Sequence, residues 1–144
     1  MSPRRLLRGT ALGLAAVLAL MQAKQVEHTN PPVRSDVDAP ADVKAILRRS
    51  CYDCHSHETR WPWYSYVAPA SWLVASDVEH ARSDMNFSEW PKFDPEEQEE
   101  TFEDVRKQVS KGKMPLRSYL LLHPGARLSE ADKAVLLGWA GEGR

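Results

Sequence analysis

The chain has 144 residues, with 19 basic side chains, 20 acidic side chains and only two cysteines. Three of the basic residues, Arg4, Arg5 and Arg8, lie at the amino terminus. The rest of the chain therefore carries 16 basic side chains against 20 acidic ones. This moderately acidic balance excludes a basic surface for nucleic acid, so we expect no nucleic-acid partner. An acidic surface can steer a positively charged protein partner, but it also serves simply as a solvated face.

The amino terminus has the layout of an export signal. Its first eight residues include the three arginines and no acid, and an unbroken apolar stretch follows from Ala11 to Met21. Met21-Gln22-Ala23 makes a poor cleavage site because a bulky residue takes the place of a small one. The apolar run is also short for a transmembrane helix, which needs about 20 residues. Residues 1–23 are therefore either a cleaved signal peptide or, as we favour, a retained membrane anchor, and the chain is exported.

Residues 24–40 are polar and contain three of the ten prolines. This composition is typical of an extended tether between a membrane and a folded domain. Residues 41–144 remain for folding, enough for one small domain with a modest core of its own.

Four segments of this domain are predicted to be helices bounded by proline or capping residues. They run from Asp38 and Pro40 towards Cys51, from about Pro69 to Arg82, from Asp94 and Pro95 to near Gly112, and from Ser129 towards the end of the chain. Apolar residues recur at helical spacing in each segment, and none alternates as a strand does. The domain is therefore predicted to be all-α. The acidic run Glu96 to Glu100 suits the positive end of its helix and is interpreted as a solvated helix start.

Both cysteines belong to one motif, Cys51-Tyr52-Asp53-Cys54-His55. Two thiols at this spacing share one face of a helical turn, and each can bond to a vinyl group of a porphyrin while the following imidazole binds the iron. The motif predicts one haem c per chain, covalently held through Cys51 and Cys54, with His55 as an iron ligand. A redox dithiol, half of a zinc site and a plain disulfide are the alternatives, with His57 and His80 as further zinc ligands.

The sixth iron ligand is predicted to be Met114. This residue stands just after the end of a predicted helix and before Pro115, so a loop presents its thioether. A Met/His pair raises the reduction potential and closes the iron to small ligands. His123, His80 and an open site are the alternatives, and Met114 could instead fill a gap in the core.

Aromatic residues gather just after the haem motif. Trp61 and Trp63 are the closest in sequence, so we predict that they wall the haem pocket, where an indole N–H could hydrogen-bond a propionate. The alternative for either residue is an ordinary core or surface aromatic.

Several motifs occur together in the chain: Asn30-Pro31-Pro32, Cys51-Tyr52-Asp53-Cys54-His55-Ser56, Glu58-Thr59-Arg60-Trp61-Pro62-Trp63-Tyr64, Asn86-Phe87-Ser88-Glu89-Trp90, Lys113-Met114-Pro115 and the stretch from Tyr119 to Leu128. In these motifs the chain resembles the bacterial haem-binding domain family of single-haem c-type cytochromes. The resemblance implies a cytochrome-c-like domain, haem bound by Cys51, Cys54 and His55, and Met114 as sixth ligand. It also implies association with a di-haem peroxidase-type protein, but no activity of its own.

These observations predict an electron carrier rather than an enzyme. One haem would exchange single electrons with redox partner proteins on the periplasmic side of the cytoplasmic membrane. The alternative is an accessory or catalytic haem protein of the peroxidase or gas-binding type, with an open or labile sixth site.

Overall fold

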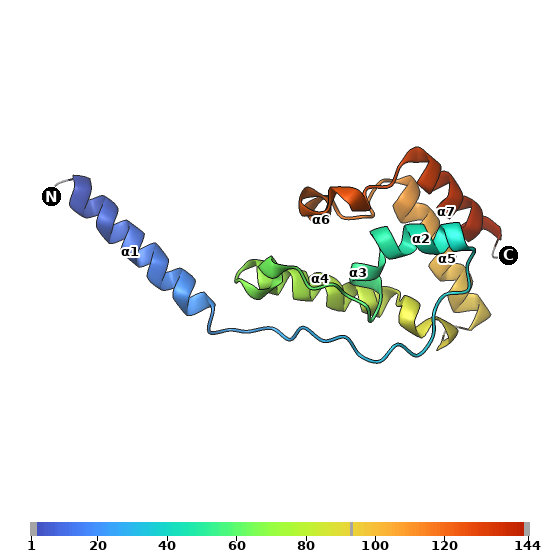
Figure 1. Cartoon of the computed structure of the whole chain (residues 1–144), viewed down its shortest axis with the longest axis horizontal. Coiled ribbons are helices and arrows are strands. Elements are labelled where there is room, and N and C mark those ends of the chain that lie inside the picture. The colour runs from blue at the N-terminus through green and yellow to red at the C-terminus, as the bar shows by residue number, and fades with distance from the viewer. Residues whose placement is uncertain (1–2, 93, 143–144) are drawn as a thin grey trace. The chain divides into compact units, whose positions relative to one another are not determined.

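The computed structural model describes residues 3–92 and 94–142. Within these residues the regular secondary structure consists of helices alone, as expected (Figure 1). The α-helices are α1 (Pro3–Met21), α2 (Ala41–Ser50), α3 (Tyr52–His55), α4 (Ala70–Asp84), α5 (Pro95–Ser110), α6 (Arg117–Leu122) and α7 (Glu130–Glu142). Three short 3₁₀ helices, η1 (Trp63–Tyr66), η2 (Phe87–Lys92) and η3 (Pro124–Ala126), lie between them.

The chain divides into two compact units. The first contains residues up to Thr29 together with Trp61–Asp77, and the second contains Asn30–Arg60 together with the chain from Val78 onwards. The haem motif and Met114 both belong to the second unit.

Local sequence signals explain where the helices of the second unit begin. Asp94 caps α5 by accepting a hydrogen bond of 2.9 Å from the Glu97 amide, and the Glu97 carboxylate accepts one of 3.3 Å from the Asp94 amide. Ser129 and Asp132 form the same reciprocal arrangement at the start of α7. Both caps satisfy amides that the first helical turn leaves without a partner. The predicted starts at Asp94 and Ser129 are confirmed.

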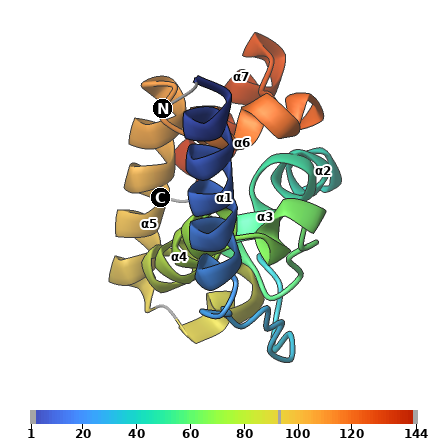
Figure 2. The same ribbon diagram turned by 90° about the vertical axis from the view of Figure 1, so that its left-hand side faces the viewer.

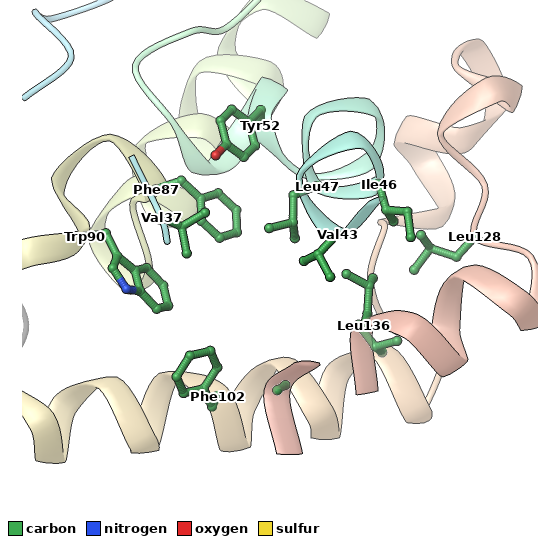
Figure 3. Packing of buried hydrophobic residues seen from close by; sticks show 12 residues of the cluster. Val37, Val43, Ile46, Leu47, Tyr52, Phe87, Trp90, Phe102, Leu128 and Leu136 are labelled. Carbon is green, nitrogen blue, oxygen red and sulfur yellow. The ribbon is translucent and has the colours of Figure 1, made fainter. Parts of the chain in front are cut away.

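The core of the second unit lies where α2 and α5 meet α7 (Figure 3). Leu47 of α2 and Leu136 of α7 are almost completely buried, and Phe102 of α5 closes the same cluster. Phe87 and Trp90 of η2 extend it, with their rings stacked at 6.0 Å between centroids. Burying each large apolar side chain contributes about 1.5–3 kcal/mol, so this cluster is the main stabilising element of the unit.

Helix α1 is one continuous helix (Figure 2). None of its residues is buried. Its leucines and Val17 are largely exposed. Within the described residues, no helix combines the length and the apolar character that crossing a bilayer requires.

The segment 24–40 contains no helix, in keeping with the prediction of an extended stretch, but its second half is packed against the domain. Val37 is completely buried in the core cluster. The amides of Arg34 and Ser35 both donate to the Ser88 carbonyl at 3.2 Å. These contacts make residues 30–40 an integral part of the second unit, a role that a proline-rich, polar composition does not reveal.

Candidate functional site: a cavity at the Cys-x-x-Cys-His motif

Cys51 links α2 to α3, and Cys54 lies within α3. Cys51 ends α2, its amide donating to the Leu47 carbonyl at 2.8 Å, and its own carbonyl accepts from the Cys54 amide at 3.1 Å and the His55 amide at 2.9 Å. No disulfide joins the two cysteines. Burial, together with the nearby Cys54, raises the pKa of Cys51 to about 12, so this side chain is a neutral thiol at physiological pH.

His55 is oriented by two main-chain carbonyls. Its Nδ1 lies 2.9 Å from the Ala81 oxygen and 3.1 Å from the Met85 oxygen, both at the end of α4. Since both partners are acceptors, Nδ1 carries the proton and Nε2 retains its lone pair. Burial lowers the pKa of His55, which favours the neutral imidazole. A neutral ring with Nδ1–H held by a carbonyl is the form in which histidine binds a metal through Nε2.

The haem motif opens onto a cavity of about 400 Å³. This volume falls within the range of pockets that hold cofactors and other small ligands. Cys51, His55 and Met114 all contribute to its wall, although they come from different parts of the sequence. The other lining residues are Leu47, Ser50, Asp84, Met85, Phe87, Glu97, Glu100, Thr101, Asp104, Val105, Gln108, Val109, Pro115, Leu128 and Leu136.

These residues suit a haem. The wall is largely apolar, as the porphyrin face requires, and it brings a thiol, an imidazole with a free Nε2 and a thioether to one space. Cys54 is not part of the wall, but it is partly buried on the same short helix as His55. Within the described residues, no cluster of three or more Cys, His, Asp or Glu side chains could hold a metal ion. The zinc alternative therefore has no ligand set there.

Met114 is delivered to the cavity by the end of α5. Gly112 adopts a left-handed backbone with φ of 61°, and its amide donates to the Val109 carbonyl at 3.0 Å. The amide of Lys113 donates to the Gln108 carbonyl at 2.9 Å. This pair of bonds is the Schellman motif, which ends a helix and reverses the chain direction. Met114 follows at once.

The histidine alternatives for the sixth ligand do not line the cavity. The His123 ring stacks on Tyr119 with 4.1 Å between centroids, and its Nδ1 lies 3.2 Å from the Tyr119 carbonyl oxygen. His80 lies on the exposed part of α4. Met85 does line the cavity, but its carbonyl is bound to His55 Nδ1, which places its backbone behind the imidazole. Of the candidate ligands Met114, His80 and His123, Met114 is thus the one that lines the cavity.

One wall of the cavity is acidic, and sequence reasoning missed it. Glu97, Glu100 and Asp104 of α5 line the cavity at helical spacing, and Asp84 joins them from α4. The interpretation of Glu96 to Glu100 only as a solvated helix start is thus incomplete. The spacing of the three α5 carboxylates matches one face of a helix, so the sequence could have indicated that they share one side of α5.

Asp53 connects the haem motif to two distant side chains. Its Oδ1 accepts from Arg60 Nε at 3.0 Å, and its Oδ2 accepts from Arg60 Nη2 at 3.1 Å and from the Tyr119 hydroxyl at 2.8 Å. Burial and the hydrogen bond to Asp53 raise the pKa of Tyr119, so this hydroxyl remains a donor.

His57 belongs to a buried network behind the haem motif. Its Nδ1 lies 3.1 Å from the Pro32 carbonyl oxygen, so this nitrogen donates, and its Nε2 accepts from Asn86 Nδ2 at 2.8 Å. The His57 amide donates to Ser88 Oγ at 2.9 Å. With both ring nitrogens engaged, His57 supports the loop after the motif.

The predicted aromatic residues Trp61 and Trp63 lie in the first unit and are not among the lining residues of the cavity. Trp63 is 78% exposed. The Trp61 ring contacts His28 edge-on at 4.6 Å, and its buried Nε1–H has no hydrogen-bond partner within the described residues. The proposed contact of these indoles with haem stays a prediction.

The helical fold and this cavity define the class of protein: a small all-α domain whose pocket suits a large, flat, largely apolar cofactor. The family model described as haem-binding domain matches residues 12–142, and the chain therefore belongs to the haem-binding domain family. No curated protein and no solved structure shows a significant match to the chain.

Proposed function

We propose that this member of the family is a single-haem c-type cytochrome that transfers electrons outside the cytoplasmic membrane. The observation that carries the proposal is the meeting of Cys51, His55 and Met114 at one cavity. A haem bound there would supply a one-electron couple between ferrous and ferric iron.

The chain's own residues would perform three tasks. Cys51 and Cys54 would hold the cofactor through thioether bonds, which keep it from dissociating. His55 would bind the iron through Nε2, because Nδ1 is engaged by the Ala81 and Met85 carbonyls. Met114, presented by the turn at the end of α5, would close the remaining position. Fixed ligands on both sides limit rearrangement during electron transfer, and no substrate is transformed.

The test is an absorption spectrum of the protein produced with cytochrome maturation machinery, oxidised and reduced, with and without carbon monoxide. We expect a coloured, six-coordinate wild type that does not bind carbon monoxide and a Met114→Ala variant that does. Met85→Leu is the matched control, since Met85 lines the same cavity but should leave the ligand in place. A wild type that already binds carbon monoxide would favour the peroxidase or gas-binding alternative.

Covalent attachment has its own test. After denaturation, the mass of the wild-type chain should include one haem, and that mass should be absent from a Cys51→Ala, Cys54→Ala double variant. A colourless wild type from cells with active maturation machinery would instead favour a thiol-disulfide protein.

We further propose that the domain works on the periplasmic side, facing redox partners such as a di-haem peroxidase-type protein. The basic and apolar amino-terminal segment supports export. The intact mass of protein recovered from periplasmic and membrane fractions would give both the location and the fate of residues 1–23. Recovery only from the cytoplasm would contradict export.

A further inference from the structure

The first unit contains a stretch of unusual composition with several exposed apolar and aromatic side chains. Residues 61–76 contain no charged side chain but hold three tryptophans and two tyrosines. Trp63, Tyr66 and Leu73 are 78, 61 and 58% exposed, and Val67 is also exposed. These four side chains, which we call the aromatic patch, lie on η1, on the residue after it and on the first turns of α4. None of them is needed for the cavity in the second unit.

The aromatic patch is fastened to the end of the exposed apolar helix α1. The Gln22 side chain donates to the Ala68 carbonyl at 3.2 Å and accepts from the Ala68 amide at 2.9 Å. Trp72 Nε1 donates to the Lys24 carbonyl at 2.9 Å. Two independent links thus hold the charge-free stretch beside the residue at which α1 ends.

The segment after α1 is joined to η1 as well. His28 Nε2 donates to the Ser65 carbonyl at 2.7 Å, and the His28 ring stacks on Tyr66 with 4.2 Å between centroids. The neighbourhood of the patch is therefore built by hydrogen bonds and ring contacts and does not depend on apolar contact alone.

The composition of this unit favours the headgroup region of a lipid bilayer as the occupant. Residues 61–76 carry no charge and are joined to the end of the exposed apolar helix α1, and the charged residues of the unit outside α1 are Lys24, Glu27 and Asp77. Tryptophan and tyrosine prefer the boundary between lipid headgroups and acyl chains, where one end of the ring is wet and the other is apolar.

We propose that the aromatic patch is a lipid-binding surface that rests in the headgroup interface of a phospholipid bilayer beside α1. The cytochrome would then have two membrane contacts, α1 and the patch, and the second would persist if residues 1–23 were removed. This surface is independent of the iron ligands, so it stands or falls separately from the proposed electron transfer.

The first test is flotation with vesicles of mixed zwitterionic and anionic phospholipid, using haem-loaded protein that begins at Gln22. Removing α1 takes no buried side chain from the protein, and Gln22 keeps its links to Ala68. We expect this protein to float, and a Trp63→Ser, Leu73→Ser variant to bind about tenfold less. The matched control is Leu121→Ser, Leu122→Ser, which removes two exposed leucines from α6 and should bind like the parent.

The second test uses the full chain, so that it does not depend on the shortened protein. Hydrogen exchange on vesicles should be slower in the peptide covering residues 61–73 of the wild type than in the Trp63→Ser, Leu73→Ser variant, with α1 equally protected in both. An unchanged haem spectrum reports that each variant is folded. Equal exchange in wild type and variant would overturn the proposal. The proposal would also be overturned if the variant lost concentration-dependent self-association but bound lipid as well as the wild type. That result would mean that the aromatic patch binds a second copy of the chain.

Discussion

The Tyr119 hydroxyl donates a hydrogen bond of 2.8 Å to Asp53 Oδ2, across a separation of 66 residues. Asp53 lies between the two cysteines of the haem motif, and Tyr119 lies on α6, the helix that follows Met114-Pro115. The bond therefore ties the helix that follows Met114, the proposed sixth ligand, to the short helix that carries His55, the proposed fifth ligand. A hydrogen bond to a charged acceptor contributes about 1.5–3 kcal/mol.

Tyr119→Phe should loosen Met114 without removing it. We expect carbon monoxide to bind the reduced protein several-fold faster, and the charge-transfer band of a ferric thioether-ligated haem to weaken. Tyr66→Phe, which alters an exposed tyrosine of the first unit, should change neither property. Unchanged carbon monoxide kinetics in Tyr119→Phe would mean that Met114 is held by the turn at Gly112 alone.

The acidic wall of the cavity should lower the reduction potential. A carboxylate near the iron favours the more positive, ferric state, and at about 10 Å the interaction is on the order of 1 kcal/mol or less. Asp104→Asn should therefore raise the potential by up to about 40 mV, as measured by redox titration. Glu103→Gln, an exposed residue on the same helix that does not line the cavity, should have a much smaller effect. Equal shifts in the two variants would indicate a general charge effect rather than a contribution of the wall.

Val37→Ala should destabilise the second unit although it lies outside every helix. The side chain is completely buried, and truncation leaves a cavity that costs about 1–3 kcal/mol. Urea unfolding followed by circular dichroism gives the change in the free energy of unfolding. Val33→Ala, at a half-exposed position, should stay within about 0.5 kcal/mol of the wild type. If Val37→Ala were as stable as the wild type, the contacts of residues 30–40 would not contribute to stability, and the interpretation of this segment as a free tether would be favoured.

Asp36 should contribute stability that depends on pH. Partial burial acts to raise its pKa, but hydrogen bonds from Tyr52 and Lys44 and the charges of Lys44 and Arg48 outweigh burial and lower the pKa below 3.8. A lowered carboxyl pKa stabilises the folded state fully above the unfolded value, and the contribution is lost as the pH falls through the folded one. Asp36→Asn should therefore cost about 1–2 kcal/mol near pH 7 and less near pH 3, which lies below the unfolded pKa of 3.8. Urea midpoints at the two pH values measure the difference, and an equal cost at both would refute the role of the charge.

Helix starts could be predicted from the sequence because they depend on neighbouring residues, and the Cys-x-x-Cys-His motif predicted which residues would share a site. Asp94 and Ser129 cap the helices that they were predicted to cap, and Cys51 and His55 lie on the same cavity wall. The expected position of Met114 after a helix end is also confirmed, since the glycine before it sets the turn.

Contacts between distant segments could not be read in the same way. Nothing in the spacing of Tyr119 or Val37 indicates that one reaches Asp53 and the other enters the core. The role of Trp61 and Trp63, inferred from nearness in sequence, stays a prediction, and the chain passes from one unit to the other between Arg60 and Trp61. Tertiary packing determines such contacts, and it leaves no periodic pattern of residues from which they could be predicted in a single sequence.

Because the left-handed turn at Gly112 ends α5 just before Met114, the length of α5 determines where position 114 lies relative to the cavity. Each residue added to a helix advances its end by about 1.5 Å and rotates it by roughly 100°, so one insertion in α5 would carry position 114 away from the cavity. The main chain, rather than the thioether, fixes where this position lies. A histidine or an alanine placed there would take the same position, so the ligand set of the proposed haem iron would change by one codon while the fold around it stayed the same.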